Sequence, residues 1–411
     1  MRHLLLFTAS AFLFTGSASA DTVCEWMDFA DKIEKAAAPP PDVPIGPEHA
    51  HAQAQVALAM FEALNAIDRR YEPYLKLPAG DPKASQDAAA TTAAYKILLD
   101  HYPGQKSALE ESYTIAMDAI ADSPAKVAGK SLGERAAAAA LKAGLIDPAV
   151  TQQPYRPVAP AGVWVPTTLP VFQPWSTAFK PWFIGSANAF RPAPPPPVTS
   201  KRYAHDLAEV QRLGGKVSKE RSAHQTLMAR YRITPDMMPA LRLIADQKGR
   251  RAVDNARLFA LYQMIGDDAG MAMADAKLHY NYWRPITAIR NAAEDGNPAT
   301  QADPSWEPLI RTPNHPEYPC GHCIFAGATA ELMKSVDADS PAWGVRVASR
   351  SIPTAAIQVL PSWDKWAEEV NLSRTLGGVH YRFSNEAGED MGRKITRQAL
   401  ATIMRPLPGT R

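Results

Sequence analysis

Three short segments in the second half of the chain combine permanent positive charges with histidines. They are Lys277 with Arg284-Pro285, then Pro319-Cys320-Gly321-His322, and finally Ser373-Arg374 with His380. Lysine and arginine bind tetrahedral oxyanions through charge-assisted hydrogen bonds, and a neutral imidazole accepts a proton or binds a metal. A close cluster of cations repels itself unless an anion neutralises it. The three segments therefore predict one site that holds an oxyanion and acts on it.

Lys277 and Arg284 are seven residues apart, a separation of about two helical turns or ~10.5 Å along one face. Their long side chains are therefore expected to converge on one ligand. Pro285 disfavours helix at Arg284 and suits the first turn of a helix after it, so Arg284 is expected at a junction before a short helix, 286–290. There its guanidinium fork would grip an oxyanion with two hydrogen bonds.

The second segment is expected to form the start of a helix. Prolines exclude a regular helix up to Pro319, whereas small and apolar residues follow over 324–333. The N–H groups and the positive end of a helix N-terminus favour an anion, and Gly321 lets the backbone approach it closely. His322, in the first turn, is the candidate general acid or base.

The third segment places a glycine pair between its two functional residues. Arg374 and His380 are six apart, which is not the spacing of one helical face, and Gly377-Gly378 breaks the helix between them. Both side chains can then turn toward one point. Arg374 supplies a third cation. His380 is expected to be an orienting hydrogen-bond partner, a nucleophile or a ligand, and spacing alone does not choose among these.

Most of the remaining chain carries helical patterns, so the predicted fold is all-α, a bundle of helices. Between about 50 and 145, alanine-rich segments predict four helices, the second opening at Asp81-Pro82 and the fourth covering about 124–143. One face of the first helix carries Val56, Met60, Leu64 and Ile67. Helical patterns return after Ser200, and no convincing strand alternation or internal repeat is present.

A segment rich in proline and tryptophan separates the two helical regions. Twelve of the 37 prolines lie between Pro154 and Pro197, together with Trp164, Trp175 and Trp182. Proline favours extended chain and tryptophan supplies apolar area, so an ordered strap over the helices is predicted rather than a flexible linker. The expected organisation is a signal peptide at 1–20, an N-terminal helical region at 21–150, the strap at 151–200 and a helical catalytic region at 201–411.

The N-terminus and the composition limit the class of protein. Arg2, a short apolar run and Ala18-Ser19-Ala20 predict a secretory signal cleaved before Asp21, and hence an exported protein, periplasmic or secreted, without a membrane span. With 44 Lys and Arg against 42 Asp and Glu, the net charge of +2 gives no general attraction to nucleic acid or membranes. Three cysteines are too few for a disulfide scaffold.

Together the three segments resemble the signature of the superfamily that joins type 2 phosphatidic acid phosphatases, bacterial acid phosphatases and vanadium-dependent haloperoxidases. Similarity to the haloperoxidase branch extends to residues 56–68 with Tyr71-Glu72-Pro73-Tyr74, to Trp283-Arg284-Pro285 and to His380-Tyr381-Arg382-Phe383. The resemblance covers most of the chain. It implies that superfamily's helical fold, vanadate as cofactor in a site that phosphate also fits, and hydrogen peroxide, halide and a small organic acceptor as partners.

The resemblance also implies roles for single residues. The residues implied to hold vanadate are Lys277, Arg284, Cys320, Gly321, Arg374 and His380. Of these, His380 would bind the vanadium itself, and Lys277 would polarise the peroxide that halide attacks. His322 would be the acid–base group. His315 matches a position where some bromide-oxidising members carry histidine.

Two positions differ from the usual pattern of that superfamily. Cys320 stands where a serine usually donates a hydrogen bond to the anion. Ser384 stands four residues after His380, where an aspartate usually orients the imidazole. Asn385 and Glu386 are the neighbouring candidates for that orienting role.

Three other functions compete with halide oxidation. A soluble acid phosphatase would use His380 as nucleophile on a phosphate ester. Cys320 and Cys323 form the C-x-x-C pattern of thiol–disulfide oxidoreductases, although that class needs a preceding strand and the chain before Cys320 is rich in proline. A protein that binds an oxyanion without turnover is the third.

Overall fold

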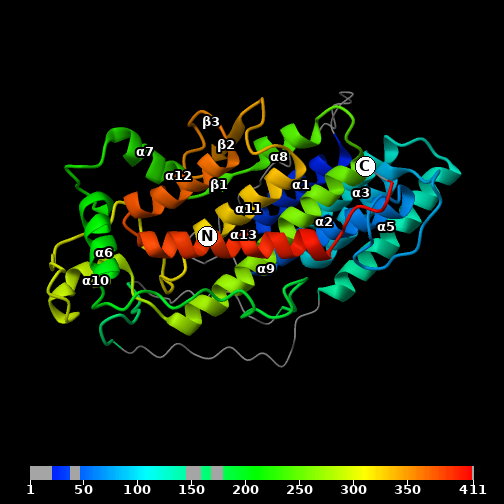
Figure 1. Ribbon diagram of the computed structural model, residues 1–411. Coiled ribbons are helices and arrows are strands. Elements are labelled where there is room, and N and C mark those ends of the chain that lie inside the picture. The colour runs from blue at the N-terminus through cyan, green and yellow to red at the C-terminus, as the bar shows by residue number, and fades with distance from the viewer. Residues whose placement is uncertain (1–20, 38–46, 145–158, 168–178, 410–411) are drawn as a thin grey trace, which may run out of the picture. The chain divides into compact units, whose positions relative to one another are not determined.

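The computed structural model describes residues 21–37, 47–144, 159–167 and 179–409. The chain forms two compact units, which are described separately; Figure 1 traces it from blue to red. Unit 1 contains Met1–Leu145, Ala245–Gln263 and Met404–Arg411, and unit 2 contains Ile146–Ile244 and Met264–Ile403. The expected signal peptide and the expected boundary at residue 150 lie outside the described residues.

Unit 1 is a helical bundle. Its helices are α1 (Thr22–Ala37), α2 (Pro47–Ile67), α3 (Gln86–His101), α4 (Lys106–Asp118), α5 (Pro124–Ala143) and the first part of α9 (Ala252–Tyr280). The four helices predicted between 50 and 145 are α2 to α5. Ser85 caps α3 with its side chain, so this helix begins at Gln86 rather than at Asp81-Pro82.

Helix α2 is buried on nearly all sides, not only on the apolar face that its sequence pattern predicted. Glu62 and Asn65 are buried as well. Glu62 Oε1 accepts the Leu75 N–H at 3.0 Å, and Asn65 Nδ2 donates to the Tyr71 carbonyl at 2.9 Å. Because buried polar atoms need such partners, these two side chains fix the loop that follows the helix.

Unit 2 contains the other helices. They are α6 (Lys201–Gly214), α7 (Ala223–Tyr231), α8 (Met238–Ala245, apart from its last residue), the second part of α9, α10 (Pro285–Arg290), α11 (Gly321–Val336), α12 (Trp363–Leu376) and α13 (Arg382–Thr402). Helices α11 and α13 pack against each other, and α12 packs on both (Figure 1). A Cβ atom at Gly392 would lie only 1.9 Å from the Ile324 carbonyl oxygen, so glycine permits this close packing.

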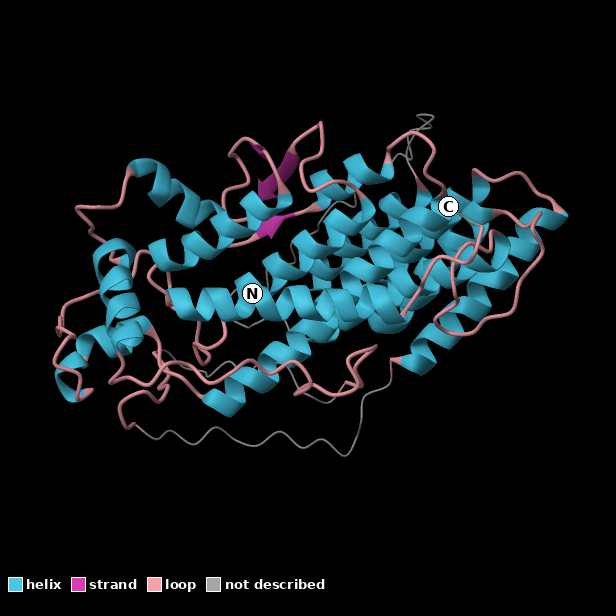
Figure 2. Cartoon of the chain, in the orientation of Figure 1, coloured by secondary structure: helices cyan, strands magenta, loops and turns pink. Residues whose placement is uncertain are grey.

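A small three-stranded sheet also belongs to unit 2 (Figure 2). Its strands, in spatial order, are β1 (Pro235–Asp236), β2 (Val345–Ser349) and β3 (Gln358–Leu360), and both pairings are antiparallel. The expectation of no strands was wrong here, because five residues of β2 are too few for alternation to stand out. Helices still dominate, and the fold is all-α as predicted. No described helix is both long and apolar enough to cross a membrane.

The described parts of the strap, 159–167 and 179–200, have a fixed course along unit 2, as predicted. Trp164 and Trp182 are 1 % and 7 % exposed, whereas Trp175 lies outside the described residues. Burial of a large aromatic side chain fixes the backbone that carries it. These stretches are therefore not a flexible linker.

Two adjacent carboxylates of α9 anchor the strap. Trp182 Nε1 donates to Asp267 Oδ2 at 2.8 Å. Asp268 accepts the backbone N–H groups of Trp182, Phe183 and Ile184 at 2.8, 2.9 and 3.2 Å. Burial raises the pKa of Asp268 to about 7, while the three N–H donors act in the opposite direction by favouring the carboxylate. One side chain thus accepts three consecutive backbone hydrogen bonds.

Replacing Asp268 with alanine should loosen the strap around 182–184. Three backbone donors would lose their acceptor, and each donor that stays buried costs about 1–3 kcal/mol. We expect faster amide hydrogen exchange at these residues, measured by mass spectrometry, and a lower free energy of unfolding. Asp275, on the same helix as Asp268, forms a partly exposed ion pair with Arg191, which lies in the strap outside 182–184. Asp275→Ala is therefore the matched control. Unchanged exchange at 182–184 in Asp268→Ala would contradict the anchoring role.

Candidate active site

Lys277 and Arg284 do not share one helical face, although their spacing predicted it. Helix α9 ends at Tyr280, and Asn281 has a φ of +43°, so the chain turns before it reaches Arg284. The two side chains still converge on one segment across this turn, since Arg284 donates to the His315 carbonyl and Lys277 donates to the Pro316 carbonyl. Arg284 precedes α10 with extended backbone, at the helix junction that Pro285 predicted.

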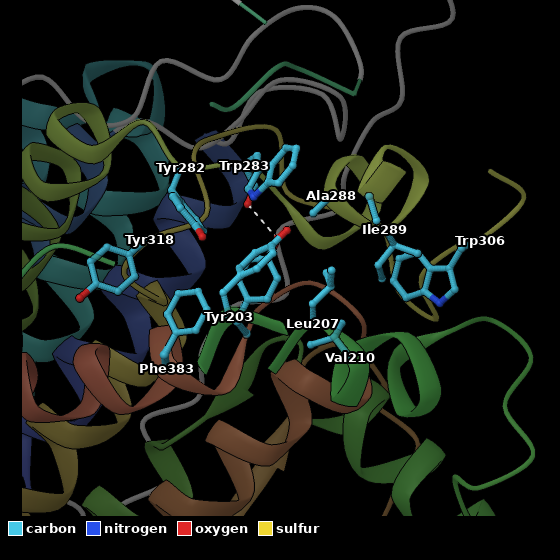
Figure 3. Packing of buried hydrophobic residues seen from close by; sticks show 12 residues of the cluster. Tyr203, Leu207, Val210, Tyr282, Trp283, Ala288, Ile289, Trp306, Tyr318 and Phe383 are labelled. Atoms are coloured by element: carbon cyan, nitrogen blue, oxygen red, sulfur yellow. Dashed lines mark hydrogen bonds between the residues drawn. The ribbon is translucent and has the colours of Figure 1, made fainter. Parts of the chain in front are cut away.

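An aromatic cluster holds the segments that carry the site (Figure 3). Its buried members are Tyr203, Leu207, Val210, Tyr282, Trp283, Ala288, Ile289, Ala292, Trp306, Tyr318, Tyr381 and Phe383. Three of them are chain neighbours of site residues: Trp283 precedes Arg284, Tyr318 lies just before the start of α11, and Tyr381 follows His380. Tyr381 also donates to the Trp283 carbonyl at 3.4 Å. The cluster therefore restricts the backbone on which the site is built.

Arg284 is buried, and its guanidinium links two of the segments. Nε donates to the His315 carbonyl at 2.9 Å, and Nη1 donates to the Val379 carbonyl at 2.9 Å. Nη1 also lies 3.2 Å from His380 Nε2. Because a guanidinium only donates, His380 Nε2 must be the accepting nitrogen. Burial lowers the pKa of Arg284 to about 10, with nearby Glu317 acting in the opposite direction.

Lys277 donates to three backbone carbonyls. They belong to Pro316, Glu317 and Pro319, at 3.0, 2.8 and 2.6 Å. An ammonium has three N–H donors, so all of them engage the segment before α11. Burial, and then the charge of Arg284, lowers the pKa of Lys277 well below its usual range. Lys277 fixes this segment, and the contact with an anion oxygen that the resemblance implies stays a prediction.

Helix α11 begins at Gly321, as predicted, with Cys320 as its N-cap. Cys320 and Cys323 form a disulfide within the first turn, so Cys320 has no S–H to donate to an anion. Backbone N–H groups and the helix dipole remain as the anion-binding features of this helix end. A Cβ atom at Gly321 would lie 2.3 Å from Met273 Sδ, so packing against α9 also accounts for the glycine.

His322 lies in the first turn of α11 and is half-buried. Its Nε2 donates to the Ile233 carbonyl at 2.8 Å, so Nδ1 carries the lone pair of the neutral ring. Burial, and then the charge of Arg374, lowers the pKa of His322 to about 3. A bound anion would raise this pKa, because a negative charge favours the imidazolium. His322 is therefore suited to carry a proton only when the nearby cations are neutralised.

Arg374, in the last turn of α12, is buried but incompletely hydrogen-bonded. Its Nε donates to Ser373 Oγ at 3.3 Å, whereas Nη2 is buried with no partner among the described residues. Burial, and then the charge of Arg284, lowers the pKa of Arg374 to about 10. Leaving such a donor unpaired costs about 1–3 kcal/mol or more. An orphaned guanidinium nitrogen of this kind suits an oxyanion.

The glycine pair brings His380 back toward Arg374, as predicted. Gly377 caps α12, and Gly378 has a φ of +79°, which a residue with a side chain rarely adopts. His380 is then buried close enough to Arg374 for that charge to lower its pKa, after the larger effect of burial and that of Arg284. The five residues Lys277, Arg284, His322, Arg374 and His380 thus lie in one place.

His380 forms a hydrogen bond with Glu317, a residue that the sequence did not single out. His380 Nδ1 lies 2.6 Å from Glu317 Oε1. Glu317 is separated from His380 by 63 positions, so no local spacing connects the two. The available signal was an acidic residue within the proline-rich run before α11. Burial raises the pKa of Glu317 to about 7, although Arg284 and Lys277 act in the opposite direction.

The candidates that sequence offered for orienting His380 were wrong. Asn385 donates to the Asn371 carbonyl at 2.9 Å, and Glu386 forms an ion pair with Arg202 at 2.8 Å. Both side chains are committed to partners away from the imidazole, because the turn into α13 directs them toward other helices. Ser384 Oγ is buried without a hydrogen bond of good geometry.

The charges of the site favour an oxyanion over a metal cation. In the part of the chain that the structure describes, the site combines three buried cations with one carboxylate, that of Glu317, which lies near Lys277 and Arg284. Within these residues no group of three His, Cys, Asp or Glu side chains could hold a metal ion. A tetrahedral anion such as phosphate or vanadate would offset the positive charge and accept hydrogen bonds from the arginines.

The C-terminal helices are similar to a known domain. The family model described as the VCPO second helical-bundle domain matches residues 257–409. The vanadium chloroperoxidase of Curvularia inaequalis is 28 % identical over 183 residues, which cover 34 % of this chain and 29 % of that protein. The matched segment thus spans less than a third of the length of this relative.

Similarity to solved structures extends over nearly the whole chain. A bacterial vanadium-dependent iodoperoxidase gives a TM-score of 0.77 at 20 % identity and covers 96 % of this chain and 99 % of its own. A holo-type bacterial vanadium-dependent chloroperoxidase gives a TM-score of 0.64 at 18 % identity, covering 89 % and 94 %. At these identities the structures demonstrate a shared fold.

Replacing Arg374 with methionine should weaken phosphate binding without lowering the stability of the anion-free protein. The change removes a buried charge with an unpaired donor, so the anion-free protein should keep or gain stability. Phosphate affinity should fall about 10- to 100-fold, because charged hydrogen bonds to the anion are lost. Thermal unfolding with and without phosphate measures both effects, since a bound ligand raises the melting temperature.

Lys365→Met is the matched control for this experiment. Lys365 is an exposed cation on the same helix and pairs with Glu368 at 3.0 Å. This variant should keep the full phosphate-induced shift. The assignment of Arg374 to the anion site fails if Arg374→Met shows the same shift as the parent.

Proposed function

We propose that this chain, a vanadium haloperoxidase-like protein by its fold and its C-terminal helical domain, binds vanadate and oxidises halide with hydrogen peroxide. The observation that carries the proposal is the orphaned Arg374 Nη2, which lies in the same buried cationic cluster as His380, whose Nε2 is an acceptor. A tetrahedral oxyanion would satisfy the donor. His380 Nε2 would bind its metal centre once Arg284 Nη1, which donates to this nitrogen at 3.2 Å, turned to an anion oxygen instead. The residues present therefore fit vanadate.

Each residue has a definite task in this proposal. Arg284 and Arg374 hold the oxygens through charge and hydrogen bonds, together with the first-turn N–H groups of α11. His380 Nε2 would be the ligand to vanadium. Lys277 adds positive charge and holds the segment before α11. Vanadate, when bound, supplies a redox-inert Lewis acid that activates peroxide toward halide.

His322 is the proton carrier in this proposal. Nε2 donates its hydrogen bond to the Ile233 carbonyl, so Nδ1 is the nitrogen that can accept a proton. Its pKa is about 3 beside the unneutralised cations and rises when an anion offsets them. His322 can then take up the proton that hydrogen peroxide releases on binding, as a general base whose pKa approaches the working pH.

The disulfide of Cys320 and Cys323 suits a site that meets peroxide. Peroxide oxidises thiolates to sulfenic acid and beyond, and a disulfide presents no thiolate. Both sulfurs are buried, which disfavours exchange with the thiols of another protein. The thiol–disulfide oxidoreductase suggested by the C-x-x-C pattern is therefore not favoured.

The candidate place for a small organic acceptor is a cleft of about 580 Å³ that Thr375 helps to line. Thr375, on its wall, directly follows Arg374, and Asn385 Oδ1 lies 3.4 Å from Cys323 Sγ. Acidic and basic side chains such as Glu368 and Arg382 both line the cleft. This lining favours a polar acceptor over a purely apolar one.

Phosphatase activity is the second candidate, and the hydrogen bond between His380 and Glu317 is the observation that favours it. A carboxylate on Nδ1 strengthens Nε2 as a nucleophile in the same way as it strengthens Nε2 as a ligand. Phosphate esters also present the tetrahedral oxyanion that the cations would hold. Binding without turnover is the remaining possibility, and one assay separates the three.

Vanadate loading should confer halide oxidation on the purified protein. We expect bromination of a phenolic dye with bromide and hydrogen peroxide after vanadate is added, and none before. Chloride and iodide are tested in parallel. His380→Ala should lower the rate by about 100-fold or more through loss of the vanadium ligand. His279→Ala removes an exposed histidine near the end of α9 and should leave the rate unchanged.

Two results would overturn the proposal. Hydrolysis of a phosphomonoester that vanadate inhibits, without halide oxidation, would assign the protein to the phosphatases. Tight binding of phosphate and vanadate with neither activity would assign it as an oxyanion-binding protein.

A further inference from the structure

We infer that Glu317 is the positioning residue for His380, holding the imidazole so that its Nε2 faces the oxyanion. This inference rests on the proposed function, because it takes Nε2 as the nitrogen that meets the bound group. Glu317 is a buried carboxylate, and it lies in a different segment of the chain from His380.

The Glu317 carboxylate accepts hydrogen bonds from two consecutive residues. Glu317 Oε1 accepts from His380 Nδ1 at 2.6 Å and from the Tyr381 backbone N–H at 3.2 Å. One bond fixes the ring and the other fixes the backbone that carries it. Together they restrict both the position and the rotation of the imidazole, which a single hydrogen bond does not.

Glu317 is itself held from several sides. Its backbone N–H donates to the Tyr282 carbonyl at 2.8 Å, and its own carbonyl accepts from Lys277 Nζ at 2.8 Å. Tyr318, the next residue, is buried in the aromatic cluster. A side chain on such a fixed backbone is pre-organised, so His380 does not have to be ordered when an anion binds.

The partners on both ring nitrogens determine the tautomer of His380. Arg284 Nη1 only donates, so Nε2 at 3.2 Å is the acceptor. In the neutral ring the proton then lies on Nδ1, where the Glu317 carboxylate accepts it. A histidine that binds a metal through one nitrogen commonly donates its other N–H to a carboxylate, which raises the basicity of the ligand nitrogen.

Glu317 helps His380 to act as a ligand, but its negative charge opposes the binding of an anion. It lies near enough to Arg284 and Lys277 to influence both, so it cancels part of the positive charge of the site. Removing that charge should therefore strengthen the binding of any anion that is held by charge alone. Glutamine keeps an amide oxygen that can accept from Nδ1, but it lacks the charge that raises the basicity of Nε2, so it should weaken an anion that needs His380 as a ligand. These effects have opposite signs and can be told apart.

The test compares vanadate and phosphate in the anion-free full chain and in Glu317→Gln. We expect vanadate affinity, measured by equilibrium dialysis and elemental analysis, to fall about 10- to 100-fold. Phosphate affinity, measured by calorimetry, should be unchanged or higher. A merely structural role would weaken both ligands together. Equal vanadate affinity in parent and variant would overturn the inference.

A second variant restores a carboxylate from the other side. Ser384 lies close enough to influence the Glu317 carboxyl. In the double variant Glu317→Gln/Ser384→Asp, vanadate affinity should recover by about tenfold over Glu317→Gln. If the double variant keeps its phosphate affinity but gains no vanadate affinity, positioning by a carboxylate is contradicted. Glu386→Gln, which removes the acid paired with Arg202, is the control and should change neither affinity.

Nitrogen NMR of His380 tests the tautomer without any vanadate. The parent should show a protonated Nδ1 and an unprotonated Nε2, and the reverse tautomer would overturn the inference. This measurement also separates the inference from the proposed function. If the parent shows the expected tautomer but binds vanadate no more tightly than phosphate, Glu317 still positions His380, and only the vanadate assignment fails.

Discussion

The structure depends on burying three cations together. Lys277, Arg284 and Arg374 are 0–2 % exposed, and two like charges ~4 Å apart repel by about 4 kcal/mol at an effective dielectric constant of ~20. Backbone carbonyls engage Lys277 fully, and Glu317 supplies a negative charge. Arg374 still keeps an unpaired nitrogen. An oxyanion bound here would offset these charges and so stabilise the folded chain, as the proposed function requires.

The rest of unit 2 keeps these charges from separating. Trp283 and Tyr381, next to Arg284 and His380, are packed in the aromatic cluster, so the site residues cannot move outward without exposing aromatic surface. The glycine contact between Gly392 and Ile324 holds α11 against α13. Apolar packing of this kind provides the stability that an uncompensated group of charges lacks.

The sequence predicted the backbone conformation correctly where proline or glycine restricts it locally. Pro285 placed Arg284 at a helix junction, and the glycine pair allowed the chain to reverse before His380, because proline and glycine act within one or two residues. Sequence failed where a contact is distant. The 63 positions between Glu317 and His380 hide their hydrogen bond. The turn at Asn281, where φ is +43°, was missed because a single asparagine only tolerates such a backbone and does not require it.

A crystal structure of the protein with vanadate, located through the anomalous scattering of vanadium, would reveal whether the buried cations hold an oxyanion. A single peak within bonding distance of His380 Nε2, with its oxygens contacting the Arg374 guanidinium, is the predicted result. No peak at this position under saturating vanadate, or a peak held elsewhere while Arg374 Nη2 stays unpaired, would contradict the central claim that the buried cations exist to hold an oxyanion.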